Sequence, residues 1–288
     1  MRKTHSCRLE IGRSSFMLHW SSGAIQSLYA PFTVTSPSES GDAHYSMAER
    51  SPLPAPSKKT YWSGPSWRMT AGRDGIAVDV VDPHSQRWQC AAEMDETFSC
   101  GVFYPLVAPV GSCVECLYPP VDRVVFANRL SIEGTVLVHA SAVRINEGVY
   151  LFCGRSGIGK STIAQLWLEK SGCALLNDDR AVVFCKGRNA WAGAAPWHGK
   201  NPAVDPAAGP LRAIFHLGHA SNNRLRRLDP SVAVARLLAT GVIPFYYEPS
   251  VAAAMDAITE VCSAAPSFDL DFYPDADVLD FVAREVGL

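Results

Sequence analysis

The stretch Gly154-Arg155-Ser156-Gly157-Ile158-Gly159-Lys160-Ser161-Thr162 decides the fold. It fits the pattern Gly-x4-Gly-Lys-Ser/Thr of a phosphate-binding P-loop. An apolar run rich in β-forming residues, 149–153, precedes it, and apolar residues recur with helical spacing in 163–170 after it. Strand, glycine loop and helix in this order predict that the whole stretch binds a nucleotide. The alternative is a glycine-rich turn that only caps a helix.

The residue types in this loop suit a triphosphate. Gly154, Gly157 and Gly159 can adopt backbone angles that turn successive N–H groups inward. The helix that follows adds its free N–H groups and the positive end of its dipole. We expect Lys160 to contact the β- and γ-phosphates and the Ser161 hydroxyl to complete a Mg²⁺ shell. The pattern therefore predicts ATP and Mg²⁺ as the cofactors.

Composition narrows the class of protein. The chain has 288 residues, 48% of them hydrophobic, which is enough for one large domain or two modest ones. Its net charge of −2 argues against a nucleic-acid partner held by bulk charge. The sequence has no run of roughly 20 apolar residues that would span a membrane. The polar residues Arg8 and Glu10 interrupt any signal-peptide core, so we expect a cytoplasmic protein.

The nine cysteines are scattered and odd in number. In a reducing cytoplasm most would be small buried apolar residues. Cys113-Val114-Glu115-Cys116 is the one close pair and has the spacing of half a zinc site. Because no second pair exists at metal spacing, a structural role is favoured over a metal site.

Residues 1–120 are expected to form a small, mainly antiparallel β domain, with acceptor recognition as a candidate role. Short β-type runs at 67–70, 76–81 and 87–90 are separated by turn signals. The segment 35–59 is rich in Ser, Pro and Gly and predicts an exposed loop or linker. Trp62, Trp67 and Trp88 would line a peptide groove or, as tryptophans more often do in a small β domain, fill its core.

Residues 121–288 are expected to form the second domain. A helix over 122–130 would open it, directly after Pro119 and Pro120. A strand over 135–143 and the turn 146–148 would lead into the glycine loop as a β-hairpin. That connection differs from a doubly wound sheet, in which parallel strands are joined by crossovers.

Two adjacent carboxylates, Asp178 and Asp179, follow a short apolar strand at 173–176. At a strand end the backbone can bend, so that one of them reaches Mg²⁺ and the other a substrate hydroxyl. The alternative is an Asp–Asp turn without a function, which the nearby P-loop pattern disfavours. Further along the chain, the pattern predicts a strand at 211–217, helices at 229–240, 251–263 and 277–286, and an edge strand at 268–272. It also predicts a charged loop at 221–227, which would either bind phosphate or be an exposed loop without a function.

At this point the residues resemble a family. Val138-His139-Ala140-Ser141-Ala142-Val143, the glycine loop and Leu176-Asn177-Asp178-Asp179 look like the catalytic domain of the HPr kinase/phosphorylase family, over about residues 122–287. That resemblance implies an α/β fold of α+β character with a mixed sheet, related to phosphoenolpyruvate carboxykinase. Pro196-Trp197-His198-Gly199 and 223–228 also resemble a branch found beside peptide natural-product genes, some of whose members phosphorylate a serine of a precursor peptide.

The resemblance also implies residue roles. Lys160 and Ser161 would bind phosphate and Mg²⁺, and His139 would lie beside the phosphates. Asp178 would be the base and Asp179 the Mg²⁺ ligand, or the two roles would be exchanged. Family members often form hexamers, which implies a homo-oligomer. The family's Leu-Glu-Val-Arg-Gly segment is absent downstream of the aspartates, and residues 1–120 do not match its N-terminal domain, so neither HPr as a substrate nor a phosphorylase activity is implied.

Three functions follow from these observations. The first is an ATP- and Mg²⁺-dependent kinase that phosphorylates a hydroxyl, in particular a serine, of a peptide or protein acceptor. The second is a small-molecule kinase or a carboxykinase-like enzyme. The third is a non-catalytic ATP-binding regulator or peptide-binding protein. The residues alone do not distinguish ATP from GTP.

Overall fold

The computed structural model describes residues 5–20, 27–34, 43–48, 52, 54, 57, 59–82, 86–105, 117–169, 172–275 and 277–287. The Cys113–Cys116 pair lies outside these ranges. The chain divides into two compact units. The first holds residues 1–10, 14–133 and 244–251, and the second holds 11–13, 134–243 and 252–288. Within the described ranges no helix is both long and apolar enough to cross a membrane.

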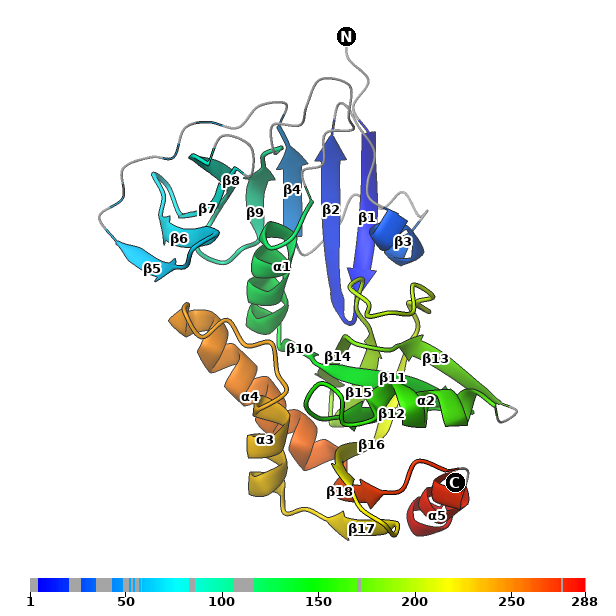
Figure 1. The fold of residues 1–288 in the computed structure, drawn as a ribbon. Coiled ribbons are helices and arrows are strands. Elements are labelled where there is room, and N and C mark those ends of the chain that lie inside the picture. Colours follow the sequence, from blue (N-terminus) through cyan, green and yellow to red (C-terminus); the bar gives the residue numbers. More distant parts are fainter. Residues whose placement is uncertain are drawn as a thin grey trace. The chain divides into compact units, whose positions relative to one another are not determined.

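The first unit is built on a mixed sheet with the strand order β3-β1-β2-β4-β9-β8-β7-β6-β5 (Figure 1). β4 runs parallel to both β2 and β9, whereas the registers from β9 to β5 are antiparallel. The strands are β1 (His5–Ile11), β2 (Ser14–Trp20), β3 (Thr33–Val34), β4 (Ala43–Met47), β5 (Thr60–Ser63), β6 (Trp67–Ala71), β7 (Ile76–Val81), β8 (Trp88–Met94) and β9 (Cys100–Phe103), with a 3-10 helix at Ser27–Phe32.

Helix α1 (Val121–Ile132) belongs to the first unit, although the sequence placed it at the start of the second domain. The reason is its buried apolar face. The Phe126 ring packs edge-on against Phe16 at 4.9 Å between centroids and lies 5.9 Å from both Tyr29 and Tyr45. The helix therefore completes the core of the β unit.

The prediction of a loop or linker over 35–59 is wrong for part of that segment. β4 lies within it, paired on both sides, because its residues alternate between buried and exposed. Tyr45 is fully buried, and its hydroxyl donates a hydrogen bond of 2.6 Å to the Phe98 carbonyl oxygen. The strand is short and is flanked by Ser- and Pro-rich residues, so the alternation of its apolar and polar side chains is not recognisable in the sequence.

The tryptophans of this unit are not simply core residues. Trp62 is 44% exposed, and its ring lies 5.8 Å from Trp67 and 6.2 Å from Tyr246. Trp88 is half-buried under the Arg68 guanidinium, which lies 4.7 Å from the ring centre.

The second unit is built on a mixed sheet with the order β10-β14-β15-β16-β12-β11-β13, extended by β18 and β17 beyond β16. The strands β12, β16 and β18 run parallel to one another. The strands are β10 (Thr135–Val138), β11 (Ala140–Ile145), β12 (Gly148–Cys153), β13 (Cys173–Asn177), β14 (Ala181–Lys186), β15 (Asn189–Ala194), β16 (Ala208–His219), β17 (Arg224–Arg227) and β18 (Ser267–Phe272); the helices are α2 (Lys160–Leu168), α3 (Pro230–Leu238), α4 (Glu248–Ala264) and α5 (Asp277–Val286).

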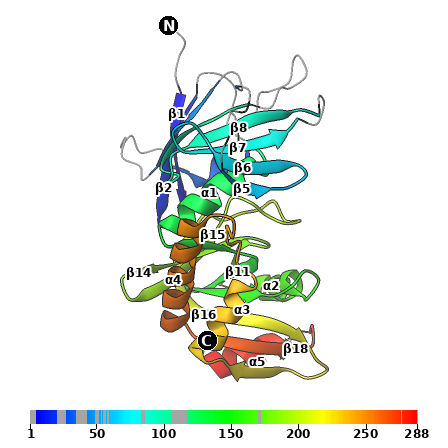
Figure 2. The same ribbon diagram turned by 90° about the vertical axis from the view of Figure 1, so that its left-hand side faces the viewer.

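The predicted hairpin into the glycine loop is confirmed. β11 and β12 pair antiparallel from Ala140 opposite Cys153 to Ile145 opposite Gly148. Every residue of β12 is buried, because the strand has neighbours on both sides and helices on both faces of its sheet. Figure 2 shows α2 and α4 on opposite faces of the sheet.

The predicted single strand over 135–143 is instead broken at His139. β10 pairs with β14, whereas β11 pairs with β12 and β13 at the other end of the strand order. The His139 N–H donates a hydrogen bond of 2.8 Å to the Thr240 carbonyl oxygen at this break. His139 thus lies where the chain passes from β10, at one end of the strand order, to β11, near the other end.

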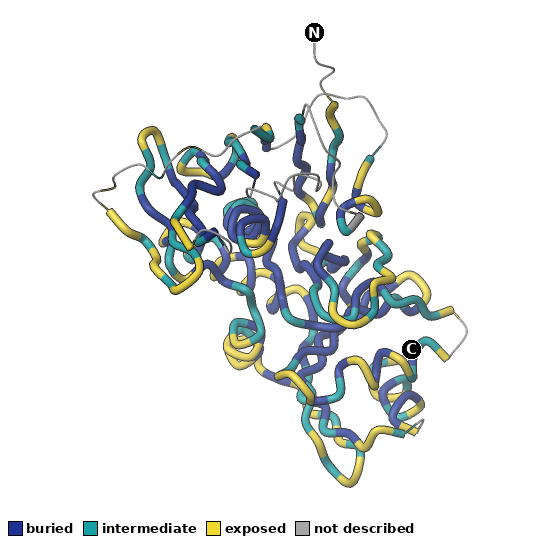
Figure 3. The backbone as a smooth tube through the Cα atoms, turned by 45° about the horizontal axis from the view of Figure 1, so that its top comes forward, coloured by how far each residue is buried: buried dark blue, intermediate teal, exposed yellow. Residues whose placement is uncertain are grey.

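Two predictions near the C-terminus need correction. Residues 224–227 form strand β17 rather than a loop, because they pair antiparallel with β18 from Arg224 opposite Asp271 to Arg227 opposite Phe268. β18 consequently has a neighbour on each side and is not an edge strand. The predicted helix over 277–286 is confirmed, and beside the C mark in Figure 3 it alternates between buried and exposed turns.

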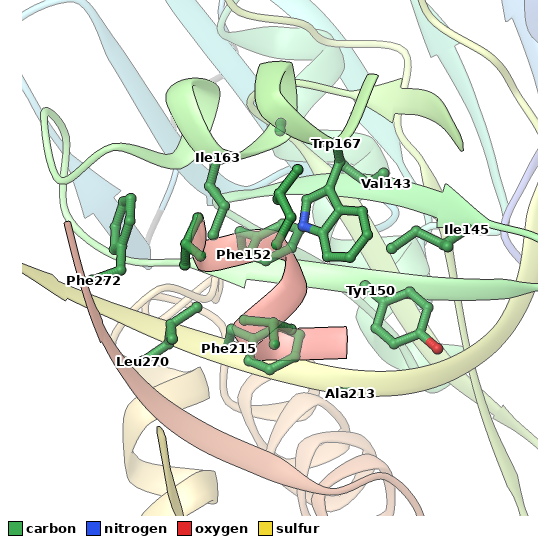
Figure 4. Packing of buried hydrophobic residues seen from close by; sticks show 14 residues of the cluster. Val143, Ile145, Tyr150, Phe152, Ile163, Trp167, Ala213, Phe215, Leu270 and Phe272 are labelled. Carbon is green, nitrogen blue, oxygen red and sulfur yellow. The ribbon is translucent and has the colours of Figure 1, made fainter. Parts of the chain in front are cut away.

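A core of aromatic and aliphatic side chains fixes α2 against β12 and β16 (Figure 4). Phe152 stacks on Phe215 with 5.3 Å between ring centroids. Ile163 and Trp167 of α2 pack into the same cluster. The start of α2, and with it the glycine loop, is therefore held on the sheet by burial rather than by helix propensity.

We expect Phe152→Ala to lower the free energy of unfolding by about 3–5 kcal/mol, because it leaves a cavity in a fully buried site. Urea denaturation followed by circular dichroism measures the loss. Phe245→Ala is the matched control, since Phe245 is 71% exposed and should cost less than about 1 kcal/mol. Equal effects of the two substitutions would contradict the assignment of Phe152 to the core.

Candidate functional site

The glycine loop, residues 154–159, joins the end of β12 to the first residue of α2. Gly157 and Gly159 have φ angles of 81° and 103°, a region that strains residues with side chains. A Cβ atom on Gly159 would also lie 2.8 Å from Cζ of Phe272. Ile158 is buried, so it anchors the loop and can offer a ligand only its backbone. Both glycines are thus required by the observed backbone.

Lys160 begins α2 and lies folded back over the loop. Its side-chain Nζ donates hydrogen bonds to the carbonyl oxygens of Gly154, at 2.8 Å, and Arg155, at 3.1 Å. The residue is only 7% exposed. Burial lowers the pKa of Lys160, whereas the nearby Asp179 carboxylate acts to raise it. A buried ammonium held by neutral carbonyls is well suited to bind an anion.

A buried asparagine shapes the turn that carries the two aspartates. The Asn177 side-chain amide donates to the carbonyl oxygens of Ala195, at 2.9 Å, and Trp197, at 3.0 Å. Its oxygen accepts the N–H groups of Asp179, at 2.8 Å, and Arg180, at 2.9 Å. Sequence reasoning did not assign Asn177 a role. The available signal was an Asn directly after a strand, where its side chain favours a turn.

Asp178 is fixed by the segment 196–201, here named the strap. Its carboxylate accepts hydrogen bonds from the backbone N–H groups of Gly199, at 2.8 Å, and Asn201, at 3.0 Å. A Cβ atom on Gly199 would lie 2.9 Å from one carboxylate oxygen and 3.1 Å from the other. The Ser141 hydroxyl donates to the Asp178 carbonyl oxygen at 2.9 Å. The strap therefore orients this carboxylate, and β11 holds the backbone of the same residue.

Asp179 lies in a cluster with His139 and Arg180. One carboxylate oxygen is 2.9 Å from Nη1 of Arg180, and the other is 3.1 Å from Nδ1 of His139. The same His139 nitrogen lies 3.0 Å from the Asp179 carbonyl oxygen and in contact with Nη1 of Arg180. Burial lowers the pKa of His139, as do the positive charges of Lys160 and Arg180. His139 is therefore neutral near pH 7.

The structure thus brings together residues that the sequence placed far apart. The charges of Lys160, Asp179 and Arg180 act on one another and on His139. Ser161 and Thr162 stand in the first turn of α2 with exposed side chains, and Arg155 and Ser156 are exposed on the loop. Sequence reasoning missed Arg180, for which the only signal was its place after the two aspartates.

The oxygen donors here suit a hard cation such as Mg²⁺ held jointly with phosphate. They are the Ser161 hydroxyl and the Asp179 carboxylate. Among the residues that the structure describes, no group of three His, Cys, Asp or Glu could hold a metal ion. A cation at Ser161 and Asp179 would consequently take its remaining ligands from phosphate oxygens and water.

A second histidine, His216, is buried behind the loop. It lies on β16, in register with Cys153 of β12 and Asp269 of β18, and is 6% exposed. Its Nε2 has no hydrogen-bond partner. Burial lowers the pKa of His216 to about 4, below its ordinary value of 6.5. The folded protein therefore excludes a proton that the unfolded chain accepts below pH 6.5.

The stability that His216 contributes should be complete above pH 6.5 and lost as the pH falls from 6.5 toward 4. The difference in pKa corresponds to about 3 kcal/mol of unfolding free energy over that window. Urea denaturation at pH 7, 5.5 and 4 compares the wild type with His216→Gln. We expect the variant to lose less stability on acidification, and parallel losses in the two proteins would contradict the assignment.

Comparisons with family models and with curated proteins found no match, whereas the comparison with solved structures found distant similarity. Among solved structures, the Hpr(Ser) kinase/phosphatase from Coxiella burnetii is similar, with 11% sequence identity and a TM-score of 0.32. The match covers 52% of this chain and 94% of that chain. The structural relationship is distant, and it carries no argument about what the site binds.

Proposed function

We propose that the chain is an ATP- and Mg²⁺-dependent kinase that transfers the γ-phosphoryl group to a hydroxyl of a peptide or protein, in particular of a serine. The observation that carries the proposal is the convergence of Lys160, His139 and Asp179 beside the glycine loop. Asp178 lies next to this cluster and is held separately by the strap.

Phosphate binding is assigned to the glycine loop and the start of α2. Backbone N–H groups of the loop and of the first turn of α2 would surround the β- and γ-phosphates. Lys160 would exchange its two carbonyl partners for phosphate oxygens and neutralise part of their charge. Neutral His139 would accept a hydrogen bond from Arg180 at Nδ1 and, with its proton on Nε2, would donate one to a phosphate oxygen. Ser161 and Asp179 would hold Mg²⁺, whose charge offsets that of the β- and γ-phosphate oxygens.

Asp178 is assigned as the base because its environment differs from that of Asp179. Asp179 is already among cations, whereas the Asp178 carboxylate accepts hydrogen bonds from two backbone N–H groups. A carboxylate has about four lone-pair sites, so two N–H donors leave capacity for a substrate hydroxyl. The strap that orients Asp178 would also border the acceptor.

The reaction then balances without covalent participation of the protein. The acceptor oxygen forms a bond to the γ-phosphorus while the bond from that phosphorus to the oxygen bridging to the β-phosphate breaks. The hydroxyl proton passes to the Asp178 carboxylate, and ADP leaves with the electron pair of the broken bond. The residues supply position, charge neutralisation and one proton acceptor, which is what phosphoryl transfer requires of a protein.

Calorimetric titration with ATP, in the presence and absence of Mg²⁺, tests the binding half of this proposal. We expect one ATP per chain, bound more tightly with Mg²⁺. The same titration with GTP measures the preference between adenine and guanine nucleotides. Wild-type protein that binds neither nucleotide would contradict the assignment of the loop.

A further inference from the structure

Two hydrogen bonds fix the backbone of Arg180, so only its side chain can change position. Its N–H donates to the Asn177 side-chain oxygen at 2.9 Å, and its carbonyl oxygen accepts the Ala195 N–H at 3.2 Å. Nη1 of its guanidinium lies 2.9 Å from the Asp179 carboxylate and 3.1 Å from the Asp179 carbonyl oxygen. The guanidinium is about one-quarter exposed. A rigid turn thus carries a partly accessible cation.

Arg180 and a bound Mg²⁺ would compete for the Asp179 carboxylate. A divalent cation on that carboxylate would repel the guanidinium 2.9 Å away. The released guanidinium would remain beside His139, whose nitrogen it already contacts, and near Lys160, whose pKa it lowers. Both neighbours are assigned to the phosphates, so the natural new partner of Arg180 is a phosphate oxygen.

We propose that Arg180 is a catalytic residue whose guanidinium leaves Asp179 and binds the oxygens of the transferring phosphoryl group. This inference rests on the proposed function and adds a residue to it. The planar guanidinium can donate two parallel hydrogen bonds to phosphoryl oxygens, which an ammonium cannot. Lys160 and Arg180 would then place two positive charges around the group as it moves to the acceptor.

The interaction should be stronger in the transition state than with bound nucleotide. We expect Arg180→Ala to lower turnover by about 100-fold or more, the usual cost of removing one preorganised donor. Affinity for ADP, Mg²⁺ and aluminium fluoride, which together mimic the transferring group, should fall by a similar factor. Affinity for ADP and Mg²⁺ alone should change less than about threefold.

Two further variants make this test specific. Arg180→Lys keeps the charge and loses the planar pair of donors, so it should recover only part of the turnover. Arg188→Ala is the matched control, because Arg188 is exposed in the turn between β14 and β15. It should behave as the wild type. Circular dichroism confirms that each variant is folded before its ligands are compared.

A metal titration tests the exchange itself without turnover. Mn²⁺ alone, followed by electron paramagnetic resonance, should bind Arg180→Ala more tightly than wild type, because the competing cation on Asp179 is gone. Unchanged or weaker Mn²⁺ binding would overturn the proposed exchange. Unaltered affinity of Arg180→Ala for the aluminium fluoride complex would overturn the catalytic assignment, whereas the proposed function fails only if wild type does not bind or transfer.

Discussion

Lys160→Ala is expected to reduce phosphoryl transfer by about 10³-fold, while the protein remains folded. The ammonium lies against the loop, since it already hydrogen-bonds the carbonyl oxygens of Gly154 and Arg155. Its removal takes a buried positive charge away from the place assigned to the β- and γ-phosphates. The helix should not suffer, because alanine is the best helix former and Lys160 leaves no apolar cavity.

An ADP-release assay measures the change in rate, and thermal unfolding shows that the variant is folded. Lys186→Ala is the matched control: Lys186 is exposed at the end of β14, with its ammonium 4.0 Å from the Trp191 ring centre. It should transfer phosphate at the wild-type rate. Wild-type activity in Lys160→Ala would show that the loop does not hold the phosphates.

Asp178→Asn is expected to lower turnover by about 10²- to 10⁴-fold and to leave ATP affinity within about threefold of wild type. The substitution preserves the size of the side chain but removes the proton acceptor. Its amide oxygen can still accept one of the two strap N–H groups, whereas the other N–H loses its acceptor, so thermal unfolding must show that the variant is folded. The effect on rate without an effect on binding is what separates a base from a phosphate ligand.

Steady-state kinetics and calorimetry on the same preparation measure the two quantities. Asp256→Asn, an exposed position on α4, is the matched control and should match wild type in both. If the protein only binds ATP as a regulator, its response to ATP should be the same in Asp178→Asn and in the wild type. Loss of ATP binding in Asp178→Asn would instead move the role of metal ligand from Asp179 to Asp178.

The sequence located most of the candidate site because that part of the site is local in the chain. The glycine loop, its preceding hairpin and the helix after it are contiguous, and their residue types specify their backbone. Two aspartates at a strand end were recognisable for the same reason. The break of the strand at His139 was not, because it depends on pairing with β14 and on the Thr240 carbonyl oxygen, far along the chain.

The contacts that sequence reasoning missed are long-range or involve the backbone. The strap contacts Asp178 through the backbone N–H groups of Gly199 and Asn201. Because every non-proline residue has such a group, these contacts cannot be recognised from the sequence. Arg180 is one of many arginines, and only its distance from Asp179 distinguishes it. The charged residues of β17 predict a loop, because only the pairing with β18, more than 40 residues along the chain, shows that they form a strand.

The most direct test of the central claim is mass spectrometry of candidate acceptors after incubation with the protein, ATP and Mg²⁺. The acceptors are short peptides encoded by neighbouring genes, together with free hydroxyl metabolites. We predict a gain of about 80 Da on a serine-containing peptide, the mass of one phosphoryl group, which is absent with Lys160→Ala. A gain on a metabolite alone would contradict the peptide acceptor, and no gain on any acceptor despite Mg²⁺-dependent ATP binding would contradict the kinase.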